Sequence, residues 1–217
     1  MKHIDLEQKI LDKNERIAQE NKELLAKNHV YMLDLLASPG AGKTSTIMAT
    51  IRALRDEVNI AVIEGDIAGN VDAVAIKEEG IPAVQINTGG SCHLEADMIA
   101  KALDVLDLEA IDLIIVENVG NLVCPTDFYL GENSKVMILS IPEGDDKPIK
   151  YPGIFQASKA ILLNKVDTMP VFDFDMNAFQ EVVDQLNPNA PVFKIAATKD
   201  DGVKDWAAWI KKELASV

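Results

Sequence analysis

The most informative stretch of the chain is Ala37-Ser38-Pro39-Gly40-Ala41-Gly42-Lys43-Thr44. It lies between an apolar run that ends at Ala37 and an amphipathic run, so it joins a predicted strand to a predicted helix. Gly40 and Gly42 let the backbone turn until successive N–H groups face one anion, and the dipole of the following helix adds positive potential. This pattern is typical of the P-loop, which binds the phosphates of nucleoside triphosphates.

Each position of this loop has an expected role. Lys43 is predicted to reach the β- and γ-phosphates, and the Thr44 hydroxyl can bind Mg²⁺. Ala37 stands where the usual pattern has its first glycine, at a residue that ends the strand and has no need to contact phosphate. The alternative is an ordinary glycine-rich turn. The residues predicted to bind the nucleotide are Ser38, Pro39, Gly40, Ala41, Gly42, Lys43, Thr44 and Ser45.

Outward from the loop, short apolar runs alternate with longer amphipathic ones. Leu113–Val116 is apolar on consecutive residues, as are several other short runs, which is typical of strands buried on both faces of a parallel sheet. We therefore predict an α/β fold with a doubly wound, mostly parallel sheet, whose ligands bind beyond the carboxyl ends of the strands. The predicted strands are Val30–Ala37, Asn59–Glu64, Ala83–Ile86, Leu113–Glu117, Lys135–Ile141, Ala160–Leu163 and Val192–Ala196. The predicted helices are Thr44–Asp56, Val71–Glu79, His93–Leu106, Lys147–Ala157, Asp175–Leu186 and Val203–Leu214.

The N-terminal segment has a different pattern. From Ile4 to Leu25, apolar residues recur every three to four positions among charged and amide side chains, which predicts one amphipathic helix over residues 1–28. Such a helix packs on its own domain or binds a partner or a second copy of the chain. The remaining residues, 29–217, fit a single P-loop domain, since domains commonly have about 100–200 residues.

Composition excludes several classes of protein. The 217 residues carry 21 Lys+Arg and 35 Asp+Glu, and the formal charge of −14 argues against general binding to nucleic acid or an anionic membrane. The first 28 residues lack the apolar core of a signal peptide, and no apolar run approaches the ~20 residues that cross a bilayer. We therefore expect a cytoplasmic protein, in whose reducing environment its two cysteines are more often ligands, nucleophiles or buried apolar groups than a disulfide.

A second loop indicates which base is bound. Asn164-Lys165-Val166-Asp167 follows the predicted strand Ala160–Leu163. The Asp167 carboxylate can accept two hydrogen bonds from N1–H and the exocyclic amine of guanine, a donor pair that adenine lacks. Asn164 can support the base edge, and the stem of Lys165 can cover the ring. Alone, this string is typical of a solvated turn. After a P-loop and at a strand end, it predicts GTP and GDP as ligands.

Two acidic residues end neighbouring strands near the expected γ-phosphate. Phosphoryl transfer needs Mg²⁺ and an oriented water more than a nucleophilic side chain. Asp66 is therefore a candidate for positioning Mg²⁺ or the attacking water, and Glu117 for the second shell of Mg²⁺. Glu117-Asn118-Val119-Gly120 has the acidic-x-x-Gly form expected beside a γ-phosphate, which the Gly120 N–H would sense. Solvated acids at strand ends are the alternative.

A third group of residues suggests a metal. Cys92-His93 is followed by Cys124, and both cysteines come after strand ends on the functional edge. Two thiolates and an imidazole suit Zn²⁺ or Ni²⁺ and leave a four-coordinate site open, which a second copy across a twofold axis could complete. From these residues alone, buried free cysteines remain an alternative. Trp206 and Trp209, three residues apart on the last predicted helix, indicate packing rather than a cofactor platform.

Taken together, these motifs resemble the HypB nickel-insertion GTPases of hydrogenase maturation. The resemblance extends from about Val30 to the end of the chain, in family order. Its most specific part is the run Asn121-Leu122-Val123-Cys124-Pro125. The other matching strings are Ala37–Thr44, Glu64–Asp66, Gln85–Gly89, Cys92–Leu94, Glu117–Gly120, Glu143–Pro148 with Lys150–Pro152, and Asn164–Asp167.

The resemblance implies a G domain of the SIMIBI class, which dimerises with nucleotide, and slow GTP hydrolysis coupled to nickel delivery into the [NiFe] hydrogenase large subunit. It implies that Cys92, His93 and Cys124 bind Ni²⁺ or Zn²⁺ at the dimer interface. It also implies a small nickel chaperone of the HypA type and the large-subunit precursor as partners.

The sequence departs from the family pattern in several places. No Cys-rich nickel motif or His-rich stretch is present, and three histidines exclude storage of many nickel ions. Gly90 and Ser91 replace the small-plus-basic pair often seen before the metal-binding cysteine. The late base-contact loop, usually Ser-Ala, reads Ala196-Ala197, where the Ala197 backbone could still contact the base. A urease-accessory type of GTPase would carry a Cys-Pro-His string, which is absent. A nucleotide-regulated scaffold with structural cysteines is the other alternative.

Overall fold

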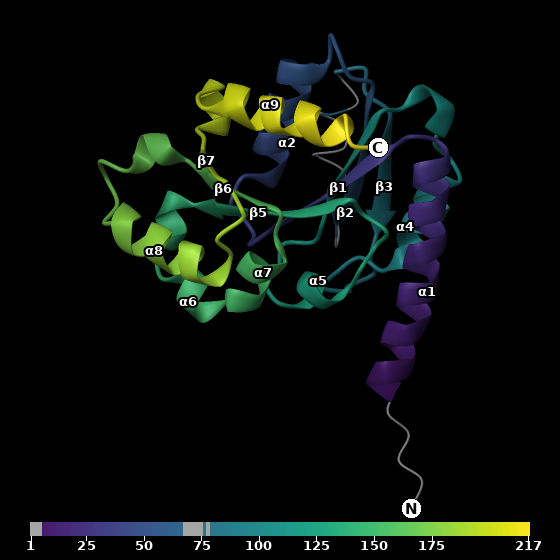
Figure 1. Ribbon diagram of the computed structural model, residues 1–217, viewed down its shortest axis with the longest axis horizontal. Coiled ribbons are helices and arrows are strands. Elements are labelled where there is room, and N and C mark those ends of the chain that lie inside the picture. The colour runs from purple at the N-terminus through teal and green to yellow at the C-terminus, as the bar shows by residue number, and fades with distance from the viewer. Residues whose placement is uncertain (1–5, 67–75, 77–78) are drawn as a thin grey trace, which may run out of the picture.

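The computed structural model describes residues 6–66, 76 and 79–217 and shows one sheet between two layers of helices (Figure 1). The sheet has seven strands in the order β3-β2-β4-β1-β5-β6-β7, and every described strand pair is parallel. The predicted doubly wound α/β fold is therefore confirmed. The strands are β1 (Tyr31–Ala37), β2 (Ile60–Asp66), β3 (Ala83–Asn87), β4 (Leu113–Glu117), β5 (Ser134–Ser140), β6 (Ala160–Asn164) and β7 (Val192–Lys194).

Helices cover both faces of the sheet. Those of the described residues are α1 (Leu6–Lys27), α2 (Lys43–Leu54), α4 (Ala96–Leu103), α5 (Cys124–Asp127), α6 (Lys147–Lys150), α7 (Pro152–Ala157), α8 (Met176–Leu186) and α9 (Val203–Leu214). In Figure 1, α2 and α9 lie above the sheet, α5 to α8 lie below it, and α1 stands beside α4 at one side. The N-terminal end of α1 extends beyond the rest of the domain (Figure 1).

The central strand β1 shows why the apolar runs are continuous. Leu33 and Leu35 face the core under α2 and α9, whereas Met32 and Leu36 face the opposite helix layer. Because successive side chains of a strand point to opposite faces, a strand covered on both sides needs apolar residues at consecutive positions. Asp34 is the exception on this strand, and it is completely buried.

Two predicted helices are wrong in their extent. The one expected over Lys147–Ala157 is divided into α6 and α7 at Tyr151, whose backbone (φ −130°, ψ 57°) is not helical. Pro152 explains the break, because proline disfavours the helical conformation of the residue before it and has no N–H to donate. The helix expected over His93–Leu106 extends only from Ala96 to Leu103. It begins late because Glu95 has an extended backbone (φ −113°, ψ 157°). His93 therefore lies in a loop.

Smaller differences concern the ends of other elements. The strand expected over Val192–Ala196 ends at Lys194, because Ala196 forms an antiparallel bridge with Asp201 in the next turn. Most of the helix predicted over Val71–Glu79, and the first five residues of the predicted N-terminal helix, lie outside the described residues. Within the described part of the chain, no helix is long and apolar enough to span a bilayer.

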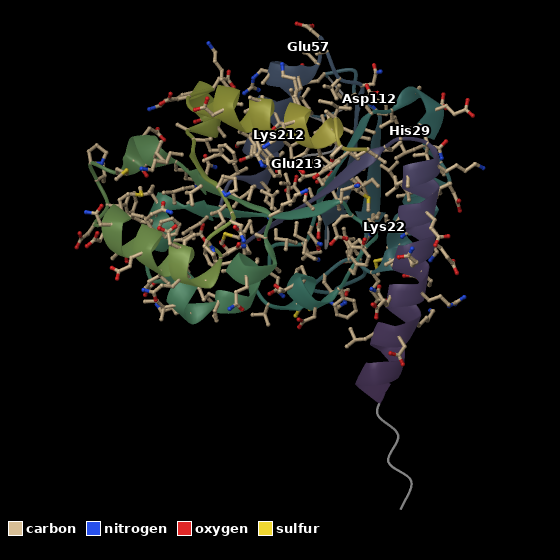
Figure 2. The ribbon with its side chains drawn as sticks, in the orientation of Figure 1. Lys22, His29, Glu57, Asp112, Lys212 and Glu213 are labelled. Atoms are coloured by element: carbon tan, nitrogen blue, oxygen red, sulfur yellow. The ribbon has the colours of Figure 1, made fainter. Side chains whose placement is uncertain are left out.

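A short turn joins α1 to the central strand. His29 adopts a left-handed backbone (φ 57°), and the Val30 N–H donates to the Leu25 carbonyl at 3.0 Å. Figure 2 shows His29 at the end of α1, and this residue is exposed. Glu213 of α9, labelled in Figure 2, accepts a hydrogen bond from the Tyr31 hydroxyl at 3.2 Å.

Candidate functional site: a phosphate loop beside a cysteine–histidine cluster

The predicted P-loop lies between β1 and α2, at the carboxyl edge of the sheet. Gly42 immediately precedes α2 with a left-handed backbone (φ 99°). A Cβ atom on Gly42 would lie 2.4 Å from Nδ2 of Asn164, so both the conformation and the close approach require glycine. Lys43 and Thr44 then occupy the first turn of α2, where free backbone N–H groups and the helix dipole favour an anion. The loop thus has the geometry of a phosphate site.

The Asn164–Asp167 loop is fastened directly to the P-loop. The buried Asn164 amide donates to the Ala41 carbonyl at 3.0 Å and accepts from the backbone N–H groups of Lys165 (2.8 Å) and Ala197 (3.2 Å). Lys165 Nζ donates to the Gly40 carbonyl at 2.7 Å. Asn164 therefore connects three loops, and the structure brings together the residues that the sequence assigned to phosphate and base.

Asp167 lies at the exposed side of this cluster. Its carboxylate pairs with Lys199 Nζ at 2.7 Å. The hydrogen bond from Lys199 lowers the pKa of Asp167, so the carboxylate keeps the acceptor form that guanine needs. Asp167 is exposed as a residue, but its side chain is 25% exposed beside Lys199.

Two of the residues predicted to hold Mg²⁺, Thr44 and Glu117, lie close together between α2 and β4. The Thr44 hydroxyl lies 3.2 and 3.3 Å from the two carboxylate oxygens of the buried Glu117. A hydroxyl and a carboxylate at the phosphate end of a P-loop are hard oxygen donors of the kind that Mg²⁺ prefers, so these residues fit that ion. Asp66 ends β2 beside Asn87 of β3, and its side chain lies outside the described residues.

The segment after β4 also touches the P-loop. A Cβ atom on Gly120 would lie 3.0 Å from the backbone nitrogen of Pro39. Gly120 therefore packs against the phosphate loop, as expected for a residue beside the γ-phosphate.

Glu143 contacts the P-loop, although the sequence did not identify it as a site residue. Its carboxylate accepts hydrogen bonds from the Ser38 hydroxyl of the P-loop and from both the backbone N–H and the hydroxyl of Ser140, the latter two at 2.8 Å. The Ser140-x-x-Glu143 spacing is that of a capping box, so a search for helix caps next to strand ends would have found it.

The three predicted metal ligands meet in space. One ligand atom each from Cys92, His93 and Cys124 lies within 4.8 Å of the others, and the Sγ of Cys92 is 3.6 Å from Nδ1 of His93. Both cysteines are free thiols, one exposed and one half-buried, which contradicts the alternative of cysteines buried as apolar groups. The His93 ring stacks on Phe128 with a centroid distance of 3.8 Å, which fixes the plane of the imidazole.

The electrostatics of this cluster suit a soft cation. The pKa of the Cys92 thiol is raised, chiefly by its hydrogen bond with Cys124, then by burial and by the charge of the Cys124 sulfur. Burial lowers the pKa of His93, which favours the neutral, ligating imidazole. Among the described residues, its buried Nε2 atom has no hydrogen-bond partner, although it lies 3.8 Å from a carboxylate oxygen of Glu95. Two thiols and a neutral imidazole form a donor set that fits Ni²⁺ or Zn²⁺.

A buried polar network holds backbone groups next to both cysteine segments. The Asn118 amide donates to Asp34 of β1 at 3.0 Å and accepts from the backbone N–H of Leu94 at 3.2 Å. Lys135 Nζ lies 3.5 Å from Asp34 and donates to the carbonyls of Pro125 (3.0 Å) and Phe128 (2.8 Å). Leu94 follows His93 and Pro125 follows Cys124, so the network reaches both sides of the cluster.

This fold and site define a class: a P-loop nucleotide-binding domain of the SIMIBI architecture that carries a candidate site for a soft metal. The signal recognition particle receptor FtsY from Elizabethkingia anophelis shares the fold, with a TM-score of 0.57 and 15% identity over 87% of this chain and 68% of that chain. Residues 32–194 match the family described as CobW/HypB/UreG, nucleotide-binding domain. The chain belongs to this family and, within it, to the hydrogenase maturation factors HypB, a nickel-binding GTPase family.

Individual relatives show how close the similarity is. The hydrogenase maturation factor HypB of Azotobacter vinelandii is 47% identical over 96% of this chain and 69% of its own length. The HypB of Escherichia coli (strain K12) is 43% identical over 97% of this chain and 72% of its own length. A crystal structure of HypB from Helicobacter pylori in complex with nickel has a TM-score of 0.90 and 38% identity, covering 94% of this chain and 96% of that one.

Proposed function

We propose that this chain hydrolyses GTP and couples its nucleotide state to the binding and delivery of nickel in hydrogenase maturation. One observation supports this most directly. Consecutive residues of a single segment contact the two sites in turn, because Glu117 faces the Thr44 hydroxyl and Asn118 holds the backbone next to His93. The same segment continues through Gly120, beside the P-loop, to Cys124 itself.

In this proposal the nucleotide lies along the carboxyl edge of the sheet. Residues 38–45 hold the phosphates, and Asp167, with Asn164, Lys165 and the Ala197 backbone behind it, reads guanine. Lys43 stabilises the negative charge that develops on the transferred phosphoryl group. Water attacks the γ-phosphorus and the bond to the β-phosphate oxygen breaks, giving GDP and phosphate.

Thr44, Glu117 and Asp66 are the residues proposed to hold Mg²⁺ and to orient the attacking water. When bound, Mg²⁺ supplies charge neutralisation between the β- and γ-phosphates. Glu117 is suited to this role because it is buried next to the Thr44 hydroxyl and cannot be displaced by solvent. The Gly120 N–H would bind the γ-phosphate, so the position of the segment that ends at Cys124 would depend on whether that phosphate is present.

Nickel is the proposed cargo of Cys92, His93 and Cys124, and the same donors accept Zn²⁺. Three ligands leave a fourth position, which a second copy would complete in a GTP-bound homodimer. The proposed partners are a small nickel chaperone of the HypA type and the precursor of the hydrogenase large subunit. The nickel complex of the H. pylori relative supports the choice of cargo.

Replacing Cys124 with alanine tests the metal site. The variant should lose tight Ni²⁺ and Zn²⁺ binding in a titration against a competing chelator, while binding a GTP analogue as the parent does. Val123→Ala, an exposed neighbour in the same loop, is the matched control and should keep both activities. Unchanged metal affinity in Cys124→Ala would exclude this site and leave a scaffold with structural cysteines as the better interpretation.

Light scattering tests the coupling between nucleotide and assembly. With a non-hydrolysable GTP analogue and Mg²⁺, the mass in solution should double, and with GDP it should return to that of one chain. A mass that stays at one chain with the GTP analogue would remove the dimer from the mechanism, although the nucleotide site would stand.

A further inference from the structure

The N-terminal helix α1 buries two amide side chains where an amphipathic helix needs only apolar ones. Asn14 and Asn21 are 6% and 3% exposed. They are seven residues apart, so they lie on the same face of the helix, two turns from each other. A polar group is buried without loss only when its hydrogen bonds are satisfied, so the partners of these amides show what the face contacts.

Both amides bridge the same two segments of the chain. Asn14 accepts from the Ala96 N–H at 2.8 Å and donates to the Tyr129 carbonyl at 2.7 Å. Asn21 donates to the carbonyls of Ala96 and Leu130, both at 2.9 Å. Each asparagine thus joins residue 96 to residues 129–130.

These two segments carry the cysteine–histidine cluster. Ala96 is three residues after His93, and Tyr129 is five residues after Cys124. Phe128, next to Tyr129, stacks on the His93 ring, so the segments meet at the cluster as well as at α1. The carbonyls that α1 holds are therefore close in sequence to all three proposed ligands.

The backbone of α1 is itself part of this contact. Gly131 has a left-handed backbone (φ 100°), and a Cβ atom there would lie 2.6 Å from the Ala18 carbonyl oxygen and 3.0 Å from the Lys22 nitrogen. The turn after Leu130 therefore packs closely against the backbone of α1, where a larger residue would not fit. A helix that merely covered an apolar face could slide or rotate without losing its partners, whereas this one is fixed to both segments.

We infer that α1 is a positioning element for the metal site: through Asn14 and Asn21 it sets the spacing between the segment of Cys92 and His93 and the segment of Cys124. This role rests on the proposed metal function, because spacing matters to a cluster only if its atoms share an ion. It gives the N-terminal helix a task in metal binding although none of its described side chains is within the cluster.

The first measurement uses Ni²⁺ itself on the full chain. Asn14→Ala, Asn21→Ala and the double variant are titrated with Ni²⁺ while the thiolate-to-nickel charge-transfer absorption is recorded. The double variant should bind Ni²⁺ at least about tenfold more weakly and shift that absorption, since ligand geometry sets it. Its affinity for a GTP analogue should stay within about twofold of the parent. Gln19→Ala is the control, because Gln19 is exposed on α1 and donates a hydrogen bond to the exposed Glu23 of the same helix.

The second measurement needs no metal and separates this inference from the proposed function. The chain has two cysteines, so in a buffer of oxidised and reduced glutathione the equilibrium between two thiols and one intramolecular disulfide reports how often Cys92 and Cys124 meet. Two glutathione thiols are released for each disulfide formed. In the double variant this equilibrium constant should fall at least about tenfold, and Gln19→Ala should leave it unchanged.

The outcomes are distinct. Weaker Ni²⁺ binding, a shifted absorption and a smaller disulfide constant support the positioning role. If the double variant is easier to unfold but its Ni²⁺ affinity, absorption and disulfide constant are unchanged, the positioning role is overturned and α1 is a packing helix. If Cys124→Ala binds Ni²⁺ as the parent does, the proposed metal function fails, while the disulfide constant still decides whether α1 sets the spacing. Should the double variant not fold, the single variants carry the same comparison.

Discussion

At the scale of single residues, Asp34 is a carboxyl group in the middle of the sheet, with no exposed surface. Burial raises its pKa from 3.8 to about 6, although the neighbouring Lys135 opposes the shift. Between these two values the folded chain holds a proton that the unfolded chain has released. This one group therefore makes the folded state less stable as the pH rises from about 4 to 6.

Asp34→Asn removes this titration and should change how stability depends on pH. The free energy of unfolding of the variant, relative to the parent, should rise between pH 4 and pH 7 by on the order of 2–3 kcal/mol. Urea denaturation at several pH values measures the difference. Asp184→Asn, at an exposed position of α8, is the control and should show a flat difference. A flat difference for Asp34→Asn as well would mean that the carboxyl group is not perturbed.

Residue types and spacing predicted the P-loop, the Asn164–Asp167 loop and the three cluster residues, because each has a fixed chemistry at a strand end. They did not predict Asn14, Asn118 or Lys135. Several partners of these side chains are backbone groups of distant segments, such as Tyr129 for Asn14 and Leu94 for Asn118. Only the fold brings those groups together, so a single sequence holds no local signal for them.

At the scale of elements, α9 closes one face of the sheet through Trp206. Its ring is 1% exposed, and its Nε1–H donates to the Thr50 hydroxyl of α2 at 2.9 Å. The ring also stacks on Trp209, with centroids 5.2 Å apart. The helical spacing of the two tryptophans predicted packing, and the structure confirms it.

Trp206→Ala should destabilise the chain by about 3–5 kcal/mol, because it opens a cavity between α9 and α2. Trp209→Ala, at a partly exposed position one turn further on, should cost less than half of that. Urea denaturation of both variants measures the difference. Equal losses would mean that α9 is held by its outer surface rather than by this contact.

The strands were easier to predict than the helices, and the reason is physical. A strand covered on both faces has apolar residues at consecutive positions, and this pattern differs from the three-to-four-residue spacing of an amphipathic helix. The limits of α4, α6 and α7 depend instead on local backbone choices at Glu95 and Tyr151, where amphipathic periodicity continues across the break. A prediction from apolar spacing alone therefore merged α6 and α7 into one helix and placed the start of α4 too early.

At the scale of the whole molecule, the segment from Glu117 to Cys124 contacts the Thr44 hydroxyl at one end and carries a proposed metal ligand at the other, so we expect the affinities for nucleotide and Ni²⁺ to be linked. If a GTP analogue tightens Ni²⁺ binding by some factor, Ni²⁺ must tighten binding of the analogue by the same factor. We expect that factor to be at least about fivefold, within the usual range of coupling between sites. Titrations of each ligand with and without the other measure it, and two independent affinities would exclude the coupling.

The turn at His29 has a mechanical consequence. Only three residues separate the end of α1 at Lys27 from the start of β1 at Tyr31, and β1 runs without interruption to Ala37, where the phosphate loop begins. Because this turn is so short and the Val30 N–H is bonded to the Leu25 carbonyl, the C-terminal end of α1 and the start of β1 cannot move independently. A displacement of that end of the helix would therefore be transmitted to the strand that leads into the phosphate loop.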